Sequence, residues 1–173
     1  MQTIIFGGGC FWCTESVFLS VKGVQSVISG YMGGDAASAN YRAVCSGNSG
    51  HIEVIKVEFD DSIVPLEVLL DVFFATHDPT TRDRQGNDVG MQYRSVVFYS
   101  DEAQKPTIEH TIHKLRDMGI NVVTEVHPAV EFYKAEEEHQ NFFNRNPNQA
   151  YCNFVIPPKL AKLRQEFSPY MTS

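Results

Sequence analysis

The stretch QTIIFGGGCFWCTESVFLSV, residues 2–21, decides the fold and carries the most reactive side chains. It opens with Gln2–Phe6, a short apolar run that predicts a buried strand. Three glycines follow and lead into a helix predicted from about Cys10 to Val21, in which Cys10 and Cys13 share one face. The chain therefore begins with a strand and a helix joined by a flexible glycine turn.

The alternation of strands and helices continues beyond this first unit. Apolar runs predict three more strands, and a run with proline near its first turn predicts a second long helix. The strands are Val24–Tyr31, His51–Phe59 and Ser95–Tyr99, and the helix is Pro65–Thr76. The order βαββαβ is typical of an α+β protein with a ferredoxin-like split βαβ sandwich, in which both helices cover one face of the sheet.

Additional segments surround this pattern. The stretch Gly30–Gly50, rich in small polar residues, predicts a long irregular segment. Beyond residue 100 the sequence predicts a helix, a strand and two further helices, the last of them after Pro157-Pro158. They cover Asp101–Met118, Asn121–Val126, Ala135–Asn144 and the run built on Leu160, Leu163 and Phe167. No linker or internal repeat divides the chain, so residues 1–173 are predicted to form one domain with a C-terminal extension.

The composition argues against several classes of function. The formal net charge is −7 and no run of five basic residues occurs, which argues against a nucleic-acid or anionic membrane surface. Residues 1–9 lack the features of a signal peptide, and the apolar run 68–75 is too short to span a bilayer. We therefore expect a cytoplasmic protein that binds neither nucleic acid nor membrane and acts as a monomer.

The spacing of the cysteines favours working thiols over a structural role. They lie at positions 10, 13, 45 and 152, too unevenly spread for a small secreted disulfide scaffold. A structural zinc site needs a second close pair, which the sequence lacks, so no bound metal is expected. The sequence also has no nucleotide-binding fingerprint, and we expect no bound cofactor.

Cys10 is predicted to be the reactive thiol. The first turn of a helix leaves amide groups unpaired and carries a partial positive charge, which favours an anion such as a thiolate. Helix N-termini and Cys-x-x-Cys spacing both lower the pKa of a cysteine below about 8.5, and Cys10 has both. Phe11 and Trp12 stand beside the sulfur as apolar walls, which suit a small apolar group rather than a phosphate.

Glu53 is predicted to be a buried acid. In the strand His51–Phe59, alternation puts it on the same face as Ile55, Val57 and Phe59. Burial disfavours the charged form, so the pKa of Glu53 should rise and keep the carboxyl protonated near neutral pH, as a general acid requires. The alternative is a strand-end glutamate paired with an arginine.

A second polar cluster lies in the glycine-punctuated loop Gly86–Ser95. It carries a carboxylate at Asp88, a phenol at Tyr93 and a guanidinium at Arg94, and it runs into a predicted strand, where sites are commonly built. Together with Tyr41 it would supply phenolic hydrogen-bond donors. The alternative is a solvated turn with Arg94 at its rim.

Three motifs resemble the ordered signatures of the peptide methionine sulfoxide reductases, in the class that acts on the S epimer. They are Gly9-Cys10-Phe11-Trp12, then Tyr41-x-x-Val44-Cys45-x-Gly47-x-x-Gly50-His51-x-Glu53, then Asp88-x-Gly90-x-Gln92-Tyr93-Arg94-Ser95. The resemblance runs from about Phe6 to Pro158, nearly the whole chain. Enzymes of this class reverse the oxidation of methionine.

The resemblance implies a catalytic role for several residues. In the family, the cysteine matching Cys10 attacks the sulfoxide sulfur, and the residues matching Phe11 and Trp12 hold the methyl group. The glutamate matching Glu53 is the acid. Oxygen then leaves as water, methionine departs reduced, and the cysteine remains as a sulfenic acid.

Further matches complete the implied site. The tyrosines matching Tyr41 and Tyr93 help to bind the sulfoxide oxygen, and the aspartate matching Asp88 organises the loop and its waters. Thioredoxin is usually the external reductant, with dithiothreitol as its substitute in vitro. The implied substrates are oxidised proteins, peptides and free methionine sulfoxide, and the implied role is protein repair under oxidative stress.

Two cysteines are candidates to resolve the sulfenic acid as a disulfide. Cys152 resembles the family position that commonly does so from a mobile tail, and it is favoured on that ground. Cys13 has the Cys-x-x-Cys spacing, and a stiff tail would give the task to Cys13, because the usual glycine-rich tail is absent. Cys45 is expected to be a small buried apolar side chain.

Two other functions fit part of the pattern. A thioredoxin-like thiol-disulfide oxidoreductase would also have Cys10-Phe11-Trp12-Cys13 at a strand-to-helix junction, but it gives no role to Glu53 or to the tyrosines. A non-catalytic reader of oxidised methionine would use the aromatic pocket only for binding.

Overall fold

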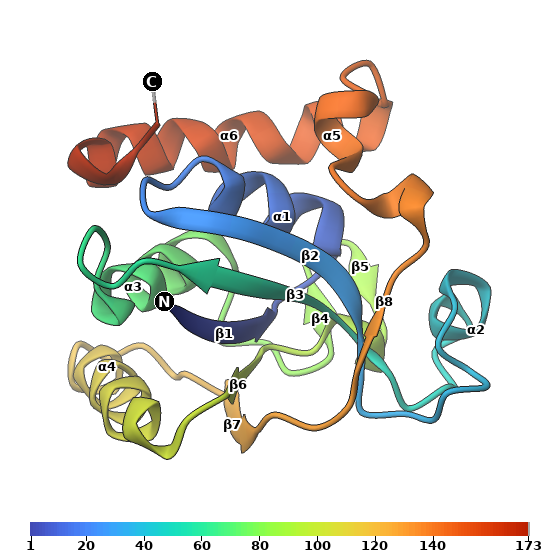
Figure 1. The fold of residues 1–173 in the computed structure, drawn as a ribbon, viewed down its shortest axis with the longest axis horizontal. Coiled ribbons are helices and arrows are strands. Elements are labelled where there is room, and N and C mark those ends of the chain that lie inside the picture. The colour runs from blue at the N-terminus through green and yellow to red at the C-terminus, as the bar shows by residue number, and fades with distance from the viewer. Residues whose placement is uncertain (173) are drawn as a thin grey trace.

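A six-stranded sheet forms the centre of the molecule in the computed structural model, which describes residues 1–172 (Figure 1). The strands follow the order β7-β6-β1-β3-β2-β8, and the four central strands β6, β1, β3 and β2 are antiparallel to their neighbours within that group. The six strands are β1 (Gln2–Gly7), β2 (Val24–Met32), β3 (Ile52–Phe59), β6 (Val96–Tyr99), β7 (Glu125–Pro128) and β8 (Phe132–Lys134). This arrangement confirms the ferredoxin-like split βαβ fold, with β7 and β8 added at the edges.

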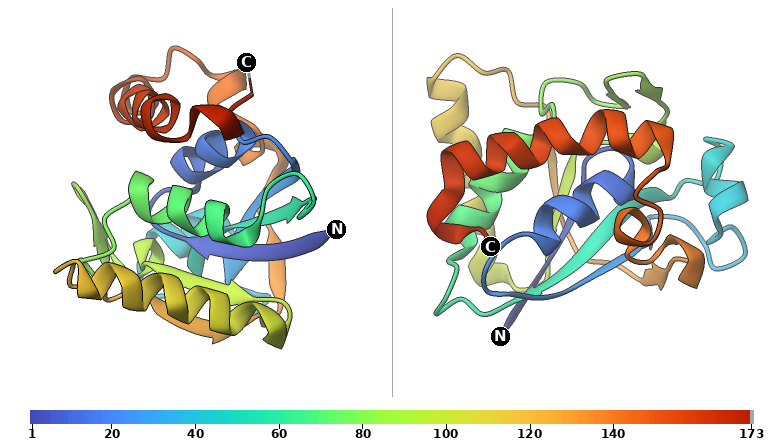
Figure 2. Two further views of the ribbon diagram at one scale, coloured as in Figure 1. Left: turned by 90° about the vertical axis from the view of Figure 1, so that its left-hand side faces the viewer. Right: turned by 90° about the horizontal axis from the view of Figure 1, so that it is seen from above.

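Helices cover one face of the sheet, and the C-terminal helix lies outside them. Helices α1 and α3 pack on the sheet, α6 contacts both of them as an outer layer, and α4 contacts α3 and β7 (Figures 1 and 2). The helices are α1 (Phe11–Leu19), α2 (Tyr41–Cys45), α3 (Leu66–Thr76), α4 (Lys105–Asp117), α5 (Phe142–Arg145) and α6 (Ala150–Phe167).

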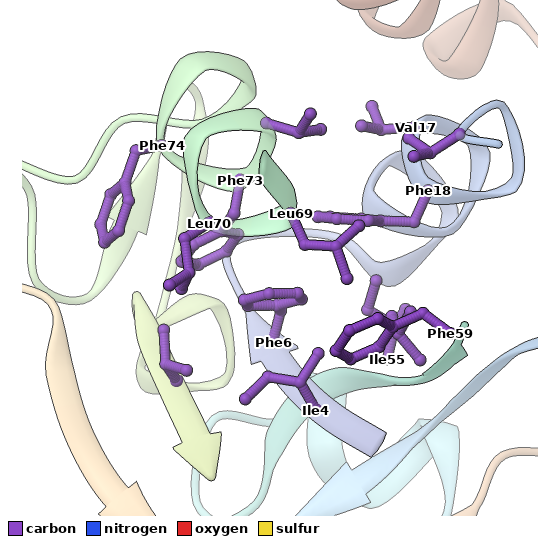
Figure 3. Close-up of a cluster of buried hydrophobic side chains, with 14 of the residues drawn as sticks. Ile4, Phe6, Val17, Phe18, Ile55, Phe59, Leu69, Leu70, Phe73 and Phe74 are labelled. Carbon is purple, nitrogen blue, oxygen red and sulfur yellow. The ribbon is translucent and has the colours of Figure 1, made fainter. Parts of the chain in front are cut away.

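The main core lies between the sheet and the two inner helices. Phe6 is fully buried, and its ring stacks on Phe18 of α1 at 4.9 Å and on Phe73 of α3 at 4.6 Å between centroids (Figure 3). Ile55 points from β3 into the same cluster, whereas its neighbour Val54 belongs to a smaller cluster on the other face. The alternation predicted from the sequence is therefore present in the strands.

The helix predicted for Ala135–Asn144 is wrong. The chain instead leaves β8 and forms a 3₁₀ turn at Glu137–His139, then the single-turn helix α5. The side chain of Gln140 accepts a hydrogen bond from the Ser29 amide at 3.0 Å and donates one to the Ser29 carbonyl at 2.9 Å. Since this side chain pairs with the edge of β2 as a strand would, tertiary contacts outweigh the helix propensity of the segment.

Helix α6 also differs from the prediction. It begins at Ala150 and runs through Pro157-Pro158, whereas the sequence predicts a helix only after the prolines. A proline inside an isolated helix costs about 3 kcal/mol. Both prolines are exposed here, and Cys152, Ile156 and Leu163 form a buried face that packs on the layer below. That packing holds the helix together across the prolines.

Smaller differences concern the loops. The strand predicted at Asn121–Val126 is displaced to β7, and α2 forms within the segment predicted to be irregular. The two-stranded ribbon β4 (Arg84–Gln85) and β5 (Asp88–Val89) precedes a 3₁₀ turn at Met91–Tyr93. No helix in residues 1–172 is long and apolar enough to cross a membrane.

Replacing Phe6 with Ala should lower the free energy of unfolding by about 3–5 kcal/mol, because the ring fills the centre of the core between both helices. Urea unfolding followed by circular dichroism measures the change. The matched control is Phe154→Ala, since the Phe154 side chain is 80% exposed and its loss should change the free energy by less than about 0.5 kcal/mol. Equal effects of the two substitutions would contradict the central position of Phe6.

Candidate functional site

Cys10 lies where the glycine run meets the first turn of α1. It caps the helix N-terminus, and β1 ends just before it at Gly7. Gly9 has a φ of 94°, a conformation that favours glycine. Gly8 lies so close to the core that a Cβ there would fall 2.9 Å from Cε1 of Phe73. The glycines therefore let the backbone that carries the thiol pack tightly, and they do not act as a flexible linker.

The structure corrects the expected pKa of Cys10. This pKa lies well above its ordinary value, because the thiol is hydrogen-bonded to Cys13, is partly buried and lies near Glu53. The amide of Trp12 favours the thiolate, as a helix N-terminus should, but the other effects outweigh it. The pKa of Cys13 is lowered instead, by the hydrogen bond from Cys10 and then by the charge of Lys159. Cys13 is the sulfur that favours the thiolate form.

Glu53 is a buried acid beside the start of α1. Its side chain is 1% exposed, and its Oε1 accepts a hydrogen bond from the Phe11 amide at 3.1 Å. Burial raises the pKa of Glu53 to about 8, with a smaller contribution from the charge of Asp88. No arginine or lysine pairs with Glu53 within residues 1–172. The prediction of a carboxyl that stays protonated at neutral pH is supported, and the alternative of an arginine pair is wrong.

An aromatic cluster forms one side of the site. Phe11 is fully buried, whereas Trp12 is half-buried and stacks on Phe142 of α5, with centroids 3.9 Å apart. The Trp12 indole donates a hydrogen bond to Nδ1 of His139 at 3.2 Å, and the His139 ring lies 4.2 Å from the ring of Tyr41. His139 and Phe142 could not be identified as site residues from the sequence, because the sequence predicts a regular helix over their segment.

The two tyrosines come from different segments and are both protonated. Tyr41 begins α2, where its amide donates to Oε2 of Glu136 at 3.0 Å. Tyr93 ends the 3₁₀ turn that follows β5. The pKa of each phenol is raised, chiefly by burial and further by neighbouring acidic groups that include Glu53. Both side chains can therefore donate hydrogen bonds near this carboxyl.

Asp88 and Arg94, which share a loop in the sequence, point to different surroundings. Asp88 in β5 accepts a hydrogen bond from the Tyr151 hydroxyl of α6. Arg94 donates to Asp83 at 2.8 Å and lies 3.6 Å from Glu125. Arg94 is thus held in ion pairs with a side chain that is 19% exposed, and Tyr151 is a contact that the sequence did not indicate.

Three of the four cysteines gather at the contact between α1 and α6. Cys13 and Cys152 are buried together with Ile156, and Cys10 packs against this cluster. All four cysteines are free thiols. Burial, with a contribution from Cys13, raises the pKa of Cys152 to about 11. The prediction for Cys45 is wrong, because the end of the short helix α2 leaves its side chain exposed.

A cavity of about 460 Å³ lies beside the free thiols of Cys10 and Cys13. Its walls come from the glycine run, the β4–β5 ribbon and α6, and they include Cys10, Cys13, Asp88, Tyr151 and Lys159. Within residues 1–172, no three His, Cys, Asp or Glu side chains are grouped as a metal site would require. The cavity is therefore lined by two thiols, a carboxyl, a phenol and an ammonium group, whereas Glu53, Tyr41 and Tyr93 are not among its lining residues.

The sequence pattern of the family described as peptide methionine sulfoxide reductase matches residues 2–170. The chain belongs to this family. It is 86% identical over 173 residues to the peptide methionine sulfoxide reductase MsrA of Psychrobacter cryohalolentis, covering 100% of each chain. It is also similar to the crystal structure of reduced Mxr1 from Saccharomyces cerevisiae (TM-score 0.81, 31% identity, 86% of this chain and 87% of that chain). Methionine sulfoxide reductase A of Corynebacterium diphtheriae gives a TM-score of 0.75 at 34% identity, with 86% and 76% covered.

Membership in the peptide methionine sulfoxide reductase family confirms the resemblance read from the three motifs. The protein is an enzyme of the oxidoreductase class, a peptide-methionine (S)-S-oxide reductase. The alternatives of a thioredoxin-like oxidoreductase and of a reader without catalysis are therefore set aside.

The stability of this reductase should fall with rising pH because of Glu53. The folded protein holds the Glu53 proton with a pKa of about 8, whereas an unfolded chain releases it near pH 4.3. The stabilising contribution is complete below about pH 4 and is lost as the pH rises to about 8, because the unfolded state then binds fewer protons. The free energy of unfolding, measured relative to Glu53→Gln, should fall by up to about 1.4 kcal/mol per pH unit between about pH 5 and about pH 7.

The control for this measurement is Glu58→Gln, which removes a carboxyl from the opposite face of the same strand. Urea unfolding of the three proteins at each pH gives both differences. For each variant, the difference in the free energy of unfolding from wild type is plotted against pH. If the two plots have the same slope, Glu53 does not carry the excess proton.

Proposed function

We propose that this reductase transfers oxidising equivalents from methionine sulfoxide to Cys10. A bond forms between the Cys10 sulfur and the sulfoxide sulfur, and the oxygen takes up protons and leaves as water. A second water then cleaves the new bond, which releases methionine and leaves Cys10 as a sulfenic acid. The observation that carries this proposal is the buried carboxyl of Glu53, protonated at neutral pH and hydrogen-bonded to the residue next to Cys10.

Glu53 and the two phenols are proposed to meet the charge that develops on the sulfoxide oxygen. Negative charge builds on this oxygen as the sulfur is attacked, and donors in a water-poor site stabilise it strongly. Glu53 supplies the proton, while Tyr41 and Tyr93 supply hydrogen bonds. The raised pKa of all three groups supports these roles, since each holds a proton to give.

The remaining site residues are proposed to hold the substrate and to accept the thiol proton. Phe11 and Trp12 contact the methyl group. Asp88 holds the β4–β5 ribbon against α6 by accepting a hydrogen bond from the Tyr151 hydroxyl. Because Cys13 already accepts a hydrogen bond from Cys10, it takes the Cys10 proton as the attack proceeds.

Cys13 is proposed to resolve the sulfenic acid before Cys152 takes part. Attack of Cys13 on the Cys10 sulfur forms a disulfide and releases the hydroxyl as water. Cys152, buried against Cys13 on helix α6, then attacks the Cys13 sulfur and frees Cys10 as a thiol. This order differs from the one favoured from the sequence, because Cys152 lies within helix α6 and is buried against Cys13.

An external dithiol is proposed to complete the cycle. Yeast Mxr1 has been solved in complex with Trx2, and we propose thioredoxin as the physiological reductant here, with dithiothreitol able to replace it in vitro. The proposed substrates are oxidised proteins, peptides and free methionine sulfoxide. We propose a role in protein repair in the cytoplasm, where thiols are kept reduced.

The acid role of Glu53 predicts a slow first step in Glu53→Gln. Mixing excess protein with the S epimer of a methionine sulfoxide peptide, without reductant, should form methionine at least about 100-fold more slowly than wild type, as expected for loss of a general acid. Cys10→Ser should form none, and the R epimer should not react. Quenched-flow chromatography of the peptide measures each rate.

Glu58→Gln is the matched control and should react at the wild-type rate. Equal single-turnover rates for wild type and Glu53→Gln would remove the acid role from Glu53. Turnover by Cys10→Ser would reject the covalent mechanism altogether.

The order of disulfides predicts different products in two variants. After one turnover without reductant, Cys152→Ser should contain a Cys10–Cys13 disulfide, because the first exchange needs only these two sulfurs. Cys13→Ser should accumulate the Cys10 sulfenic acid, trapped by dimedone. Peptide mapping by mass spectrometry identifies the products, with Cys45→Ser as the control that should match wild type. A Cys10–Cys152 disulfide formed rapidly in Cys13→Ser would contradict this order.

A further inference from the structure

Lys159 is a lysine held at a defined position on the buried side of α6. It follows Cys152 and Ile156 at the spacing of one helical face, and its side chain is only partly exposed. Its Nζ donates a hydrogen bond to the carbonyl of Thr76 at the end of α3. The hydrogen bond tethers the ammonium group at the contact between α3 and α6.

Lys159 lines the same cavity as Cys10 and Cys13. Lys159 is the one basic residue among those that line this cavity, which also include Cys10, Cys13 and Asp88. The next lysine along the helix, Lys162, is exposed. Lys159 is therefore the nearest positive charge that this cavity offers to a thiolate.

Cys10 favours a negative charge on the Cys13 sulfur through its hydrogen bond, but among the charged groups around Cys13 all except Lys159 are acidic and disfavour that charge. Acidic groups near it come from β3 and β5, and a thiolate beside them experiences repulsion whenever they are ionised. The groups that influence Cys13, or are influenced by it, are Cys10, Glu53 of β3, Asp88 of β5, and Tyr151, Cys152 and Lys159 of α6. Among them only Lys159 carries a positive charge, so a thiolate at Cys13 depends on it for electrostatic compensation.

We propose that Lys159 supplies the positive charge that holds Cys13 as a thiolate and so speeds its attack on the oxidised Cys10. In that step Cys13 gives up the proton that it took from Cys10, its sulfur forms a bond to the Cys10 sulfur, and the sulfur–oxygen bond of the sulfenic acid breaks. The departing hydroxide takes up that proton and leaves as water. The proposal rests on the resolving role of Cys13 proposed above. Helix α6 would then supply both Cys152 and the positive charge that assists the attack of Cys13 on Cys10.

Alkylation by iodoacetamide tests the charge of Cys13 without any sulfoxide. In this reaction the Cys13 thiolate displaces iodide and forms a thioether, so its rate follows the thiolate fraction. A Cys10→Ser background keeps a hydrogen-bond donor next to Cys13 and makes it the only thiol in its peptide. The rate of Cys13 labelling is measured by mass spectrometry from about pH 5 to about pH 10, with and without Lys159→Gln, which removes the charge but retains an amide donor.

Lys159→Gln should slow the labelling of Cys13 at about pH 7 by about tenfold, with a corresponding rise of the midpoint by about one pH unit. Lys159→Arg should retain the rate within about threefold, because it keeps the charge. The matched control Lys162→Gln removes an exposed charge three residues further along α6 and should leave the profile unchanged. Equal profiles for Lys159→Gln and Lys162→Gln would overturn the proposal.

The background protein with Lys159 intact provides a second measurement that does not depend on how the variants fold. A labelling midpoint for Cys13 clearly below the ordinary value of about 8.5 supports the proposal, and a midpoint at or above it overturns it. Failure of Lys159 to affect labelling leaves the proposed disulfide order intact. Failure of Cys13 to resolve the sulfenic acid in the peptide-mapping experiment would instead reject the proposed order while labelling still responds to Lys159.

Discussion

The hydrogen bond from the Phe11 amide to the buried carboxyl of Glu53 connects the centre of the sheet to Cys10, the proposed active thiol. The first amides of a helix have no partner within the helix, and Glu53 accepts one of them from the neighbouring strand. The same contact fixes the distance between the acid and Cys10, which precedes Phe11. Burial of the carboxyl without a basic partner keeps it neutral, so one arrangement satisfies the backbone and prepares the acid.

Residues 136–142, which precede α6, border the site on the side of Trp12 and are held there by several hydrogen bonds. Buried Glu15 of α1 accepts hydrogen bonds from the Asn141 and Phe142 amides at 2.8 and 3.1 Å. Glu136 accepts from the Tyr31 hydroxyl at 2.8 Å and from the Tyr41 amide. These contacts hold the aromatic rings around Trp12. Glu53, the aromatic cluster around Trp12 and the cysteines therefore come from segments that are widely separated in the chain, and contacts with α1 hold them together.

Much of the fold and part of the site could be predicted because they depend on short-range patterns. The alternation in the strand around Glu53 identified its buried face, and the glycine run before Cys10 indicated the strand-to-helix junction, as the structure shows. The segment around Gln140 could not be predicted, because its conformation depends on pairing with the distant strand β2. Likewise, the helix through Pro157-Pro158 depends on the face that it buries against α1 and α3.

Periodicity and motif spacing are local properties of the chain, so the sequence alone predicted the βαββαβ order and the family, and it indicated Cys10 as the candidate thiol and Glu53 as the candidate acid. Which of the two sulfurs favours the thiolate form depends on the tertiary structure. A helix N-terminus predicts a low pKa for Cys10, but burial, Cys13 and Glu53 together have the larger effect. The hydrogen bond from Cys10, and then the charge of Lys159 more than a hundred residues away in the sequence, lower the pKa of Cys13 instead. Electrostatic effects of this kind depend on distances through space and on exclusion of water, which the order of residues does not specify.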